Sequence, residues 1–301
     1  MIPRLLSTLL LTLFLAVAAT APSAPTSTAD EPASRTLTVM TYNIRVGLGL
    51  GGSWSGHDPK ENLLSIAELI LDSGADIVLL QEVDTGARRT NEVDEPALLA
   101  EGTGFHAAFS PALQRDGGHY GIAILSRWPL EVQTVQLFKP DYSGKPDLPD
   151  WYAEQRVAQV ATVQAPGGPL TVINTHLGVT KDQRLPQLTQ IATLVDRAPH
   201  PVILGGDLNA EPDAEELLPL RNRLADAYHD MGQGRAGLPA DLPIAERLTF
   251  PADDPNRCID YLFYAQSAFQ PIKTEVIAEK SLSDHRPVLA VFERTSPPTA
   301  P

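Results

Sequence analysis

Apolar runs of strand length recur along this 301-residue chain, and several contain four or more consecutive apolar residues. A strand that faces water on one side alternates apolar and polar residues, whereas a strand buried on both faces does not. The runs are "LTVMTYNI", "ADIVLLQEV", "YGIAILS", "RVAQVATVQ", "PLTVINTHL", "PVILGGDLN", "IDYLFYA" and "PVLAVFE". We therefore expect an α/β protein whose sheets are covered on both sides.

Helical periodicity lies between some of these runs. In "ENLLSIAELILDSG", Leu63, Ile66, Ala67 and Ile70 share one helix face, and Gly74 is placed to cap its carboxyl end. A second helix is expected in "DQRLPQLTQIATLVDRA", with a proline in its first turns, and a third in "DAEELLPLRNRLADAY".

The first residues have the composition of a secretory signal peptide. A single arginine precedes an apolar run that ends near Ala18, and this run is shorter than the about 20 residues of a membrane span. Cleavage after Ala18 or Ala29 fits, so we expect a secreted protein without a transmembrane helix in its mature form. Residues 30–36 are interpreted as a linker, 37–294 as one folded domain and 295–301 as a disordered tail. The proline-rich segment 139–151 is interpreted as a long surface loop.

Charge and cysteine content narrow the functional classes. The chain has 37 acidic and 23 basic residues, and removal of the leader takes away Arg4 and no acid, which leaves 22 basic residues and a net charge of −15. Such a surface disfavours long-range attraction to nucleic acid. The lone Cys258 forms no intramolecular disulfide and is interpreted as a small core residue, so stability must come from the core.

Polar side chains stand where the apolar runs end. "GGDLNAEP" presents Asp207 and Asn209 behind two glycines, which allow a sharp bend or a close approach of the backbone. The other strand-end or nearby polar residues are Asn43, Glu82, Asn174, His176, Asp260, Asp284 and His285. Oxygen ligands of this kind suit Mg²⁺, with Mn²⁺ as a close substitute, and no zinc-ligand motif occurs.

In this order, "TYNI", "LQEV", "LSR", "NTHL", "GDLN", "IDY" and "SDHRP" resemble the endonuclease/exonuclease/phosphatase superfamily. That superfamily includes DNase I-like nucleases, AP endonucleases, inositol polyphosphate 5-phosphatases and neutral sphingomyelinases. The similarity extends from about Leu37 to Phe292. It implies a four-layer α/β sandwich, with two facing mixed β-sheets flanked by helices, and makes 37–294 the catalytic domain.

The resemblance also implies roles for single residues. Glu82 would be the main metal ligand, with Asn43 beside it and Asp284 near the same ion. Asp207 would align or deprotonate the attacking water, and Asn209 would hold a phosphate oxygen.

The histidines belong to the same set of implied roles. His285 would contact the scissile phosphate, and Asp260 would fix its tautomer and favour its charged form. His176 matches a second phosphate-facing histidine that AP endonucleases lack, which places the chain on the DNase I, sphingomyelinase and 5-phosphatase side. Arg156 and Tyr120 match positions near the substrate, although Arg156 equally suits a surface salt bridge.

Three functions remain open on the sequence alone. The first is a secreted Mg²⁺-dependent phosphoesterase, expected to be a monomer, that acts on a small organic phosphate or lipid head group. The second is a secreted DNase I-like endonuclease, and the third is a non-catalytic binding module. The acidic net charge favours the first, and the local basic pair Arg88–Arg89 suits either an anion contact or a solvated loop.

Overall fold

The computed structural model describes residues 36–52, 58–140, 152, 154–228 and 243–295. Its strands are β1 (Thr36–Asn43), β2 (Ile77–Thr85), β3 (His106–Arg115), β4 (Gly118–Ser126), β5 (Leu130–Gln136), β6 (Val157–Val163), β7 (Leu170–His176), β8 (Val202–Asp207), β9 (Ala225–Asp226), β10 (Asp260–Tyr264), β11 (Phe269–Val276) and β12 (Val288–Arg294). Its α-helices are α1 (Lys60–Asp72), α2 (Glu95–Thr103), α3 (Lys181–Asp196) and α4 (Leu218–Arg221). Short 3-10 turns are η1 (Arg45–Gly47), η2 (Arg88–Thr90), η4 (Glu215–Leu217) and η5 (Ile244–Glu246).

The strands form two sheets with the same general plan. The first sheet has the order β11-β12-β1-β2-β4-β3, and the second has the order β5-β6-β7-β8-β10-β9. Each sheet contains one parallel pair near its centre, β1 with β2 and β7 with β8, while the remaining pairs are antiparallel. The carboxyl ends of each parallel pair therefore meet at one edge of their sheet.

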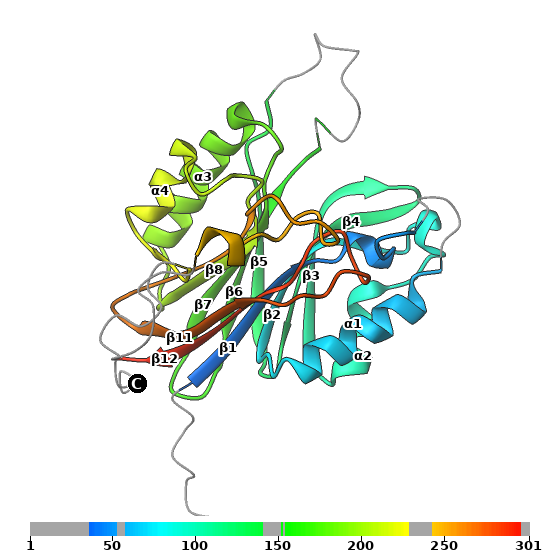
Figure 1. Ribbon diagram of the computed structural model, residues 1–301, viewed down its shortest axis with the longest axis horizontal. Helices are drawn as coiled ribbons and strands as arrows, with labels where there is room; N and C mark the ends of the chain where they lie inside the picture. The colour runs from blue at the N-terminus through cyan, green and yellow to red at the C-terminus, as the bar shows by residue number, and fades with distance from the viewer. Residues whose placement is uncertain (1–35, 53–57, 141–151, 153, 229–242, 296–301) are drawn as a thin grey trace, which may run out of the picture. The chain divides into compact units, whose positions relative to one another are not determined.

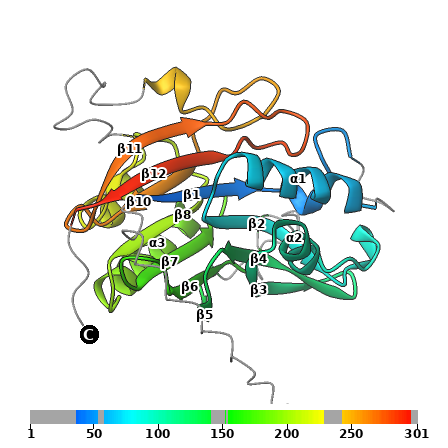
Figure 2. The same cartoon turned by 90° about the horizontal axis from the view of Figure 1, so that it is seen from below.

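Two layers of side chains explain why the strands are apolar on both faces. Val39 of β1 packs in the cluster between the two sheets, whereas its neighbour Met40 packs in the cluster that joins the first sheet to α1 and α2. Leu188 and Ile191 of α3 belong to the cluster that contains the second sheet. Figure 1 shows α1 and α2 on one side of the paired sheets and α3 and α4 on the other, and Figure 2 gives the same arrangement from below.

The predicted fold class, a four-layer α/β sandwich with two facing mixed sheets, is confirmed. All eight predicted runs form strands, and the helix predicted around residues 61–74 is α1, with its four predicted face residues buried. Gly74 follows the end of α1 with a left-handed φ of 70°. The second predicted helix is α3, and Pro186 lies inside it.

The third predicted helix is wrong over most of its length. Within 213–228, only η4 and α4 are helical, and α4 ends at Arg221. Beyond it, Ala225 and Asp226 pair with β10 as the short strand β9. Pairing at the sheet edge and the missing N–H of Pro219 outweigh the helical periodicity there.

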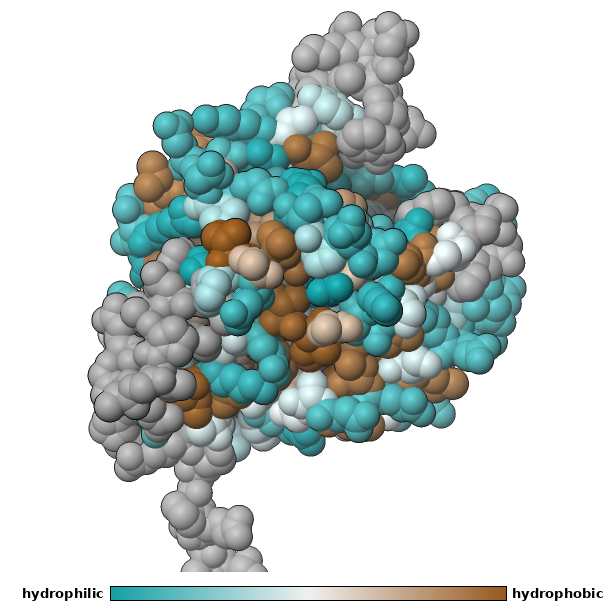
Figure 3. All heavy atoms as spheres, viewed as in Figure 1, coloured by the Kyte–Doolittle hydropathy of each residue, from teal (hydrophilic) through white to brown (hydrophobic). Residues whose placement is uncertain are grey.

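Several sequence-based predictions fall outside the described residues. These are the signal peptide, nearly all of the linker, most of the 139–151 loop and nearly all of the tail. Among the residues that the structure describes, no helix is long and apolar enough to cross a membrane. The face of the molecule in Figure 3 is hydrophilic over most of its periphery, with hydrophobic residues gathered near its centre.

Candidate active site

A cavity of about 550 Å³ opens where the carboxyl ends of the two parallel pairs face each other. Of the ten residues that the sequence predicts for the site, eight line this cavity: Glu82, Tyr120, Arg156, His176, Asp207, Asn209, Asp284 and His285. The other two, Asn43 and Asp260, hydrogen bond to residues that line it. The structure thus brings all ten together, while their chemical roles remain predictions.

Strand register places three of these residues side by side in the second sheet. His176 at the end of β7 is paired with Asp207 at the end of β8, and Asp207 is in turn paired with Asp260 at the start of β10. Gly206 permits this close packing, because it has a φ of 148° and a Cβ there would lie 1.9 Å from the carbonyl oxygen of Thr175. The glycines before Asp207 therefore serve the close approach of neighbouring strands.

Glu82 reaches the cavity from a bulge in the first sheet. The register between β2 and β4 shifts between Gln81 and Val83, and Glu82 has a left-handed φ of 53°. A bulge redirects one side chain out of the regular alternation. Here it turns the Glu82 carboxylate towards the second sheet, while Gln81 and Val83 remain buried.

Asn43 connects the two sheets at the floor of the site. Its side-chain amide donates to Glu82 Oε1 and to Asp207 Oδ2, both at 3.1 Å. Its Oδ1 accepts a hydrogen bond from the backbone N–H of Arg45 at 3.1 Å. In this orientation Asn43 positions the two carboxylates and does not present its oxygen to the cavity.

His285 and Asp260 form a buried pair. Nδ1 of His285 lies 2.9 Å from Oδ2 of Asp260, and the ring packs 4.8 Å from the ring of Phe250. Burial opposes a charge on the imidazole, but the carboxylate of Asp260 outweighs it and raises the pKa of His285 well above its usual range. The imidazole is therefore a cation near neutral pH, with Nε2 directed towards Asp207 at 3.7 Å.

Asp207 lies between the two histidines, within 3.4 Å of His176 Nε2. Its Oδ1 accepts a hydrogen bond from the backbone N–H of Asn209 at 2.9 Å. Burial, followed by the negative charge of Asp260, raises the pKa of Asp207 far above that of an exposed aspartate. A carboxylate with such a pKa is a better proton acceptor than an ordinary one.

His176 is held in one neutral tautomer. Nη1 of Arg156 lies 3.2 Å from its Nδ1, and since a guanidinium only donates, Nδ1 accepts and the ring proton stays on Nε2. Burial, and then the charges of Arg156 and His285, lower the pKa of His176. Arg156 forms an ion pair, with 3.3 Å between its Nη2 and Oε2 of Glu154, but it is only 5% exposed and lines the cavity beside Tyr120 instead of lying on the surface.

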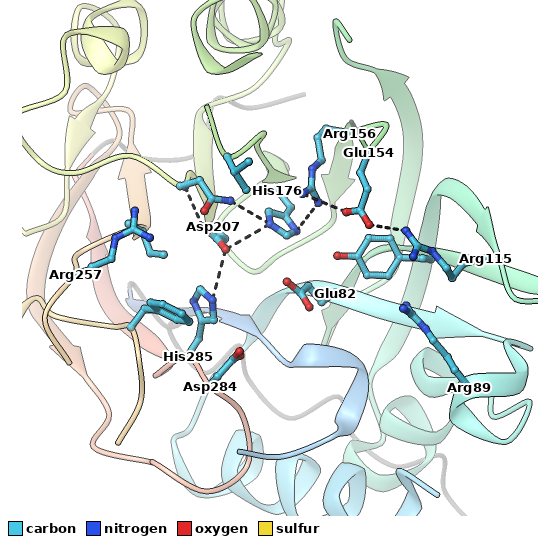
Figure 4. Close-up of a pocket in the computed structure, with 15 residues that line it drawn as sticks. Glu82, Arg89, Arg115, Glu154, Arg156, His176, Asp207, Arg257, Asp284 and His285 are labelled. Atoms are coloured by element: carbon cyan, nitrogen blue, oxygen red, sulfur yellow. Dashed lines mark hydrogen bonds and ion pairs between the residues drawn. The ribbon is translucent and has the colours of Figure 1, made fainter. Parts of the chain in front are cut away.

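The donor set fits a hard divalent cation. Figure 4 shows the carboxylates of Glu82 and Asp284 pointing into the same part of the cavity, and burial together with the charge of Asp284 raises the pKa of Glu82. A divalent cation between these carboxylates would neutralise their mutual repulsion, and carboxylate oxygens are ligands that Mg²⁺ prefers. Arg45 holds Asp284 from behind, with 3.3 Å between its Nε and Oδ2 of Asp284.

A second cluster of potential metal ligands is formed by Asp207, Asp260 and His285, and a hydrogen bond explains why these residues lie close together. Asp207, Asp260 and His285 place potential ligand atoms within 4.8 Å of one another. The Asp260–His285 hydrogen bond accounts for this closeness, and an imidazolium cannot also bind a metal through the protonated nitrogens. Glu82 and Asp284 are therefore the better anchors for a metal ion.

Other residues in the cavity were not predicted as site residues. Arg115, Glu154, Phe250 and Arg257 line it together with Arg89. Of the basic pair in "GARRT", only Arg89 faces the cavity, whereas Arg88 is exposed and pairs with Asp116 at 2.9 Å. Arg115 ends β3 and Glu154 lies two residues before Arg156, but neither belongs to the motifs that carry the resemblance.

Carboxylates, histidines and an arginine gather around one cavity between the two sheets, an arrangement that suits metal-assisted hydrolysis of a phosphoester. The sequence profile of the endonuclease/exonuclease/phosphatase family matches residues 40–285, and the chain belongs to that family. This match confirms the resemblance to the endonuclease/exonuclease/phosphatase superfamily that the sequence motifs indicate.

Sequence relatives cover most of the chain. The Escherichia coli protein YbhP, described as uncharacterized, is 26% identical over 275 residues, which are 87% of this chain and 98% of YbhP. The Shigella flexneri YbhP protein matches with the same identity and coverage.

Solved structures share the fold. An endonuclease/exonuclease/phosphatase from Beutenbergia cavernae has a TM-score of 0.63 and 24% identity, with 88% of this chain and 73% of that chain covered. The mannosyl-6-phosphatase from Bacteroides thetaiotaomicron has a TM-score of 0.62 and 17% identity, with 85% and 99% covered. The catalytic domain of human nocturnin, solved with a bound sulfate anion, has a TM-score of 0.57 and 22% identity, with 87% and 95% covered.

Proposed function

We propose that this protein is an exported Mg²⁺-dependent phosphoesterase that acts on a small organic phosphate or a lipid head group. The observation that carries the proposal is the cavity itself, in which His176 and Asp207 of the second sheet meet Glu82 of the first sheet, with Asp284 and His285 supplied by the segment before β12. A concave site of about 550 Å³ suits a small molecule better than the flat surface of a duplex. The mannosyl-6-phosphatase, one of the structural neighbours, is named for such a substrate.

The residues divide the hydrolysis among themselves. Asp207 accepts the proton of the attacking water, and its raised pKa suits it to that transfer near neutral pH. The His285 cation and the amide of Asn209 stabilise the negative charge that spreads over the phosphoryl oxygens, and neutral His176 donates from Nε2. The ester bond between phosphorus and the leaving oxygen breaks, and that oxygen is protonated from solvent.

The metal site would be formed by Glu82 and Asp284, with Asn43 holding Glu82 in place. When bound there, Mg²⁺ supplies charge stabilisation to the phosphoryl group. Export is supported by the first 29 residues alone, whose sequence has the pattern of a signal peptide. Amino-terminal sequencing of the protein recovered from culture medium tests this part and should find a start at residue 19 or 30.

The central experiment is an assay of phosphate release with Mg²⁺. The substrates are p-nitrophenyl phosphate, its bis ester, glycerol phosphate, inositol phosphates and sphingomyelin vesicles. Asp207→Asn should lower kcat by at least about a hundredfold on the best substrate, since it removes the general base. Asp196→Asn is the matched control, because Asp196, the last residue of α3, is exposed and forms an ion pair with Arg223. Full activity of Asp207→Asn would overturn the proposed role.

Metal dependence is tested separately by chelation. EDTA should abolish activity, Mg²⁺ or Mn²⁺ should restore it, and Ca²⁺ should do so poorly. Glu82→Gln should raise the Mg²⁺ concentration needed for half-maximal activity and weaken Mg²⁺ binding in calorimetry. Unchanged activity after exhaustive chelation would remove the metal from the proposal.

A further inference from the structure

One wall of the cavity carries guanidinium groups that the proposed chemistry does not use. Arg89 and Arg115 line the cavity next to Tyr120, with their guanidinium carbons 5.3 Å and 6.0 Å from the centre of its ring. Figure 4 shows both arginines across Glu82 from His285. We call Arg89, Arg115 and Tyr120 the arginine wall.

The charge around the cavity differs from that of the chain as a whole. The cavity is lined by four arginines (Arg89, Arg115, Arg156, Arg257) and four carboxylates (Glu82, Glu154, Asp207, Asp284). Three of these carboxylates belong to the proposed catalytic and metal sites, while Glu154 pairs with Arg115 and Arg156, and the buried Asp84 behind the wall pairs with Arg89. A chain with a net charge of −14 thus gathers four arginines around one cavity, two of them at this wall.

The guanidinium of Arg89 is fixed from behind. Asp84 is fully buried and accepts hydrogen bonds from Nε and Nη2 of Arg89 at 2.7 Å and 2.8 Å. The hydroxyl of Thr90 also donates to Asp84, at 3.2 Å. A guanidinium held in this way loses little further freedom when it binds an anion, so its position favours tight contact.

Glu154 links the wall to the reaction centre. One of its oxygens accepts a hydrogen bond from Arg115 at 2.5 Å, and the other lies 3.3 Å from Nη2 of Arg156. Arg156 in turn contacts His176 beside the catalytic carboxylate Asp207. A single carboxylate therefore separates the arginine beside the scissile phosphate from the arginine wall, and both are within reach of one compact molecule.

We propose that the arginine wall binds a second anionic group of the substrate, a phosphate or a carboxylate. The inference rests on the proposed function and narrows its substrate class to small phosphoesters that carry two anionic groups. The planar fork of arginine matches both kinds of anion through paired hydrogen bonds. The ester that is cleaved lies between Asp207, His176 and His285, and the second group lies against Arg89 and Arg115.

The test compares matched substrates that differ in the second group. A hexose bisphosphate is compared with the hexose monophosphate, and phosphoglycerate with glycerol phosphate, by initial rates of phosphate release with Mg²⁺. We expect kcat/KM to be at least about tenfold higher for one or both of the doubly anionic substrates, mainly through a lower KM. Which pair shows the larger ratio distinguishes a phosphate from a carboxylate in the second position.

Arg115→Gln is the first variant, because Glu154 keeps Arg156 as a partner when Arg115 is lost. It should reduce the ratio to about twofold for the hexose pair, which is the excess that a second hydrolysable phosphate brings by number, and to about one for the phosphoglycerate pair, whose members each have one phosphate. Arg88→Gln is the matched control, since Arg88 is a solvent-exposed neighbour of Arg89 that does not line the cavity. Arg89→Gln is combined with Asp84→Asn so that no buried charge is left unpaired.

Each result decides between separate claims. Equal kcat/KM for both members of each pair in the unaltered protein would overturn the second anion site and leave the phosphoesterase proposal intact. A ratio that survives both Arg115→Gln and the Arg89→Gln/Asp84→Asn variant would assign the preference elsewhere and overturn the wall. Absence of phosphate release from all four substrates, and from the p-nitrophenyl esters, would overturn the proposed function on which the inference rests.

Discussion

Glu82 shows how one residue's backbone conformation sets the site. Its left-handed φ costs about 1 kcal/mol for a residue with a side chain, and the surrounding strands impose it through the bulge opposite β4. A glutamate gives no sequence signal for this conformation. The residue type was predictable from the "LQEV" pattern, whereas the bulge that aims the carboxylate was not.

The remaining site residues divide in the same way. Asn43, His176 and Asp207 stand at the ends of predicted strands that the structure pairs in parallel, so their meeting follows from strand order once the sheet is known. Arg115 and Glu154 lie at the end of β3 and just before β6, outside any pattern, and only the pairing of distant strands brings them together. Sequence reasoning therefore finds the catalytic set more readily than the residues that would select a substrate.

Asp260 and His285 should behave as one unit in a double-mutant cycle. Asp260→Asn keeps the size but removes the charge that stabilises the imidazolium, and His285→Ala removes the imidazole. On the best phosphoester, each change should lower kcat by at least about tenfold, and the double variant should be no more than about threefold worse than His285→Ala. Additive losses, measured as the product of the single effects, would show that Asp260 acts independently of the histidine.

Cys258 should be chemically silent in the folded protein. It is 1% exposed, and burial raises the pKa of its thiol to about 12. Ellman's reagent should label less than about a tenth of the native protein at pH 8, and all of it in denaturant, because the thiolate is the reactive form.

The linked effect on stability has a defined sign. The thiol binds its proton more tightly when folded, so its contribution is present below the unfolded pKa of 9.0 and is lost as the pH rises towards 12. The free energy of unfolding should fall over that range by more in the native sequence than in Cys258→Ala. Rapid stoichiometric labelling of native protein at pH 8 would contradict the core assignment.

At the level of elements, a polar clamp joins the two sheets directly behind the site. Asn174 of β7 accepts from the side-chain amide of Gln81 at 2.8 Å and donates to the carbonyl oxygens of Leu80 and Ala123. Gln81 precedes Glu82, and Asn174 lies two residues before His176. The clamp therefore fixes the strand that carries Glu82 against the strand that carries His176.

Asn174→Ala should destabilise the fold and loosen the site. It removes the side-chain donor to two buried carbonyl oxygens and one of the acceptors of the Gln81 amide, which keeps Thr41 and Leu79, and this loss of three buried hydrogen bonds costs about 2–4 kcal/mol of unfolding free energy. Urea unfolding measures this loss, and Asn222→Ala, at an exposed position after α4, should change stability by less than about 0.5 kcal/mol. If Asn174→Ala lowered the free energy of unfolding by no more than the Asn222→Ala control does, the clamp would not hold the two sheets together.

The elements that sequence reasoning found and missed differ in burial. The eight predicted strands are largely buried, whereas β5, which was not predicted, has an alternating pattern of exposed and half-buried residues at a sheet edge. The unpredicted α2 has little periodicity, although Asp94 caps its start and Gly104 follows its end with a φ of 73°. Caps were thus a better signal for this helix than its hydrophobic pattern.

At the scale of the whole molecule, the net charge of the chain is negative, whereas the cavity is lined by several positively charged side chains. The chain carries a net charge of −14, while the cavity gathers arginines around a site for anions. A small anion that enters the cavity meets the arginines at close range, where they act with little screening. A long polyanion such as DNA must also approach the acidic surface around the cavity, which repels it, so small anions are favoured over DNA as substrates.

Duplex DNA should therefore be a poor substrate, and salt should reveal why. We expect kcat/KM for duplex DNA to be at least about tenfold below that for the best small phosphoester, which corresponds to roughly 1.4 kcal/mol. At low ionic strength the Debye length is about 30 Å, so the acidic surface repels DNA over its full approach, and added salt weakens this repulsion. Any residual DNA cleavage should then rise between about 10 mM and 150 mM salt, whereas cleavage of a small reporter ester with a single phosphate, which carries far less charge than DNA, should change little over the same range. Cleavage of plasmid DNA and release of p-nitrophenol, followed in the same buffers at fixed Mg²⁺, measure the two responses. DNA cleavage that is fast at nanomolar enzyme and falls steeply with salt would indicate attraction to the phosphate backbone, and the secreted nuclease would then replace the small-molecule phosphoesterase.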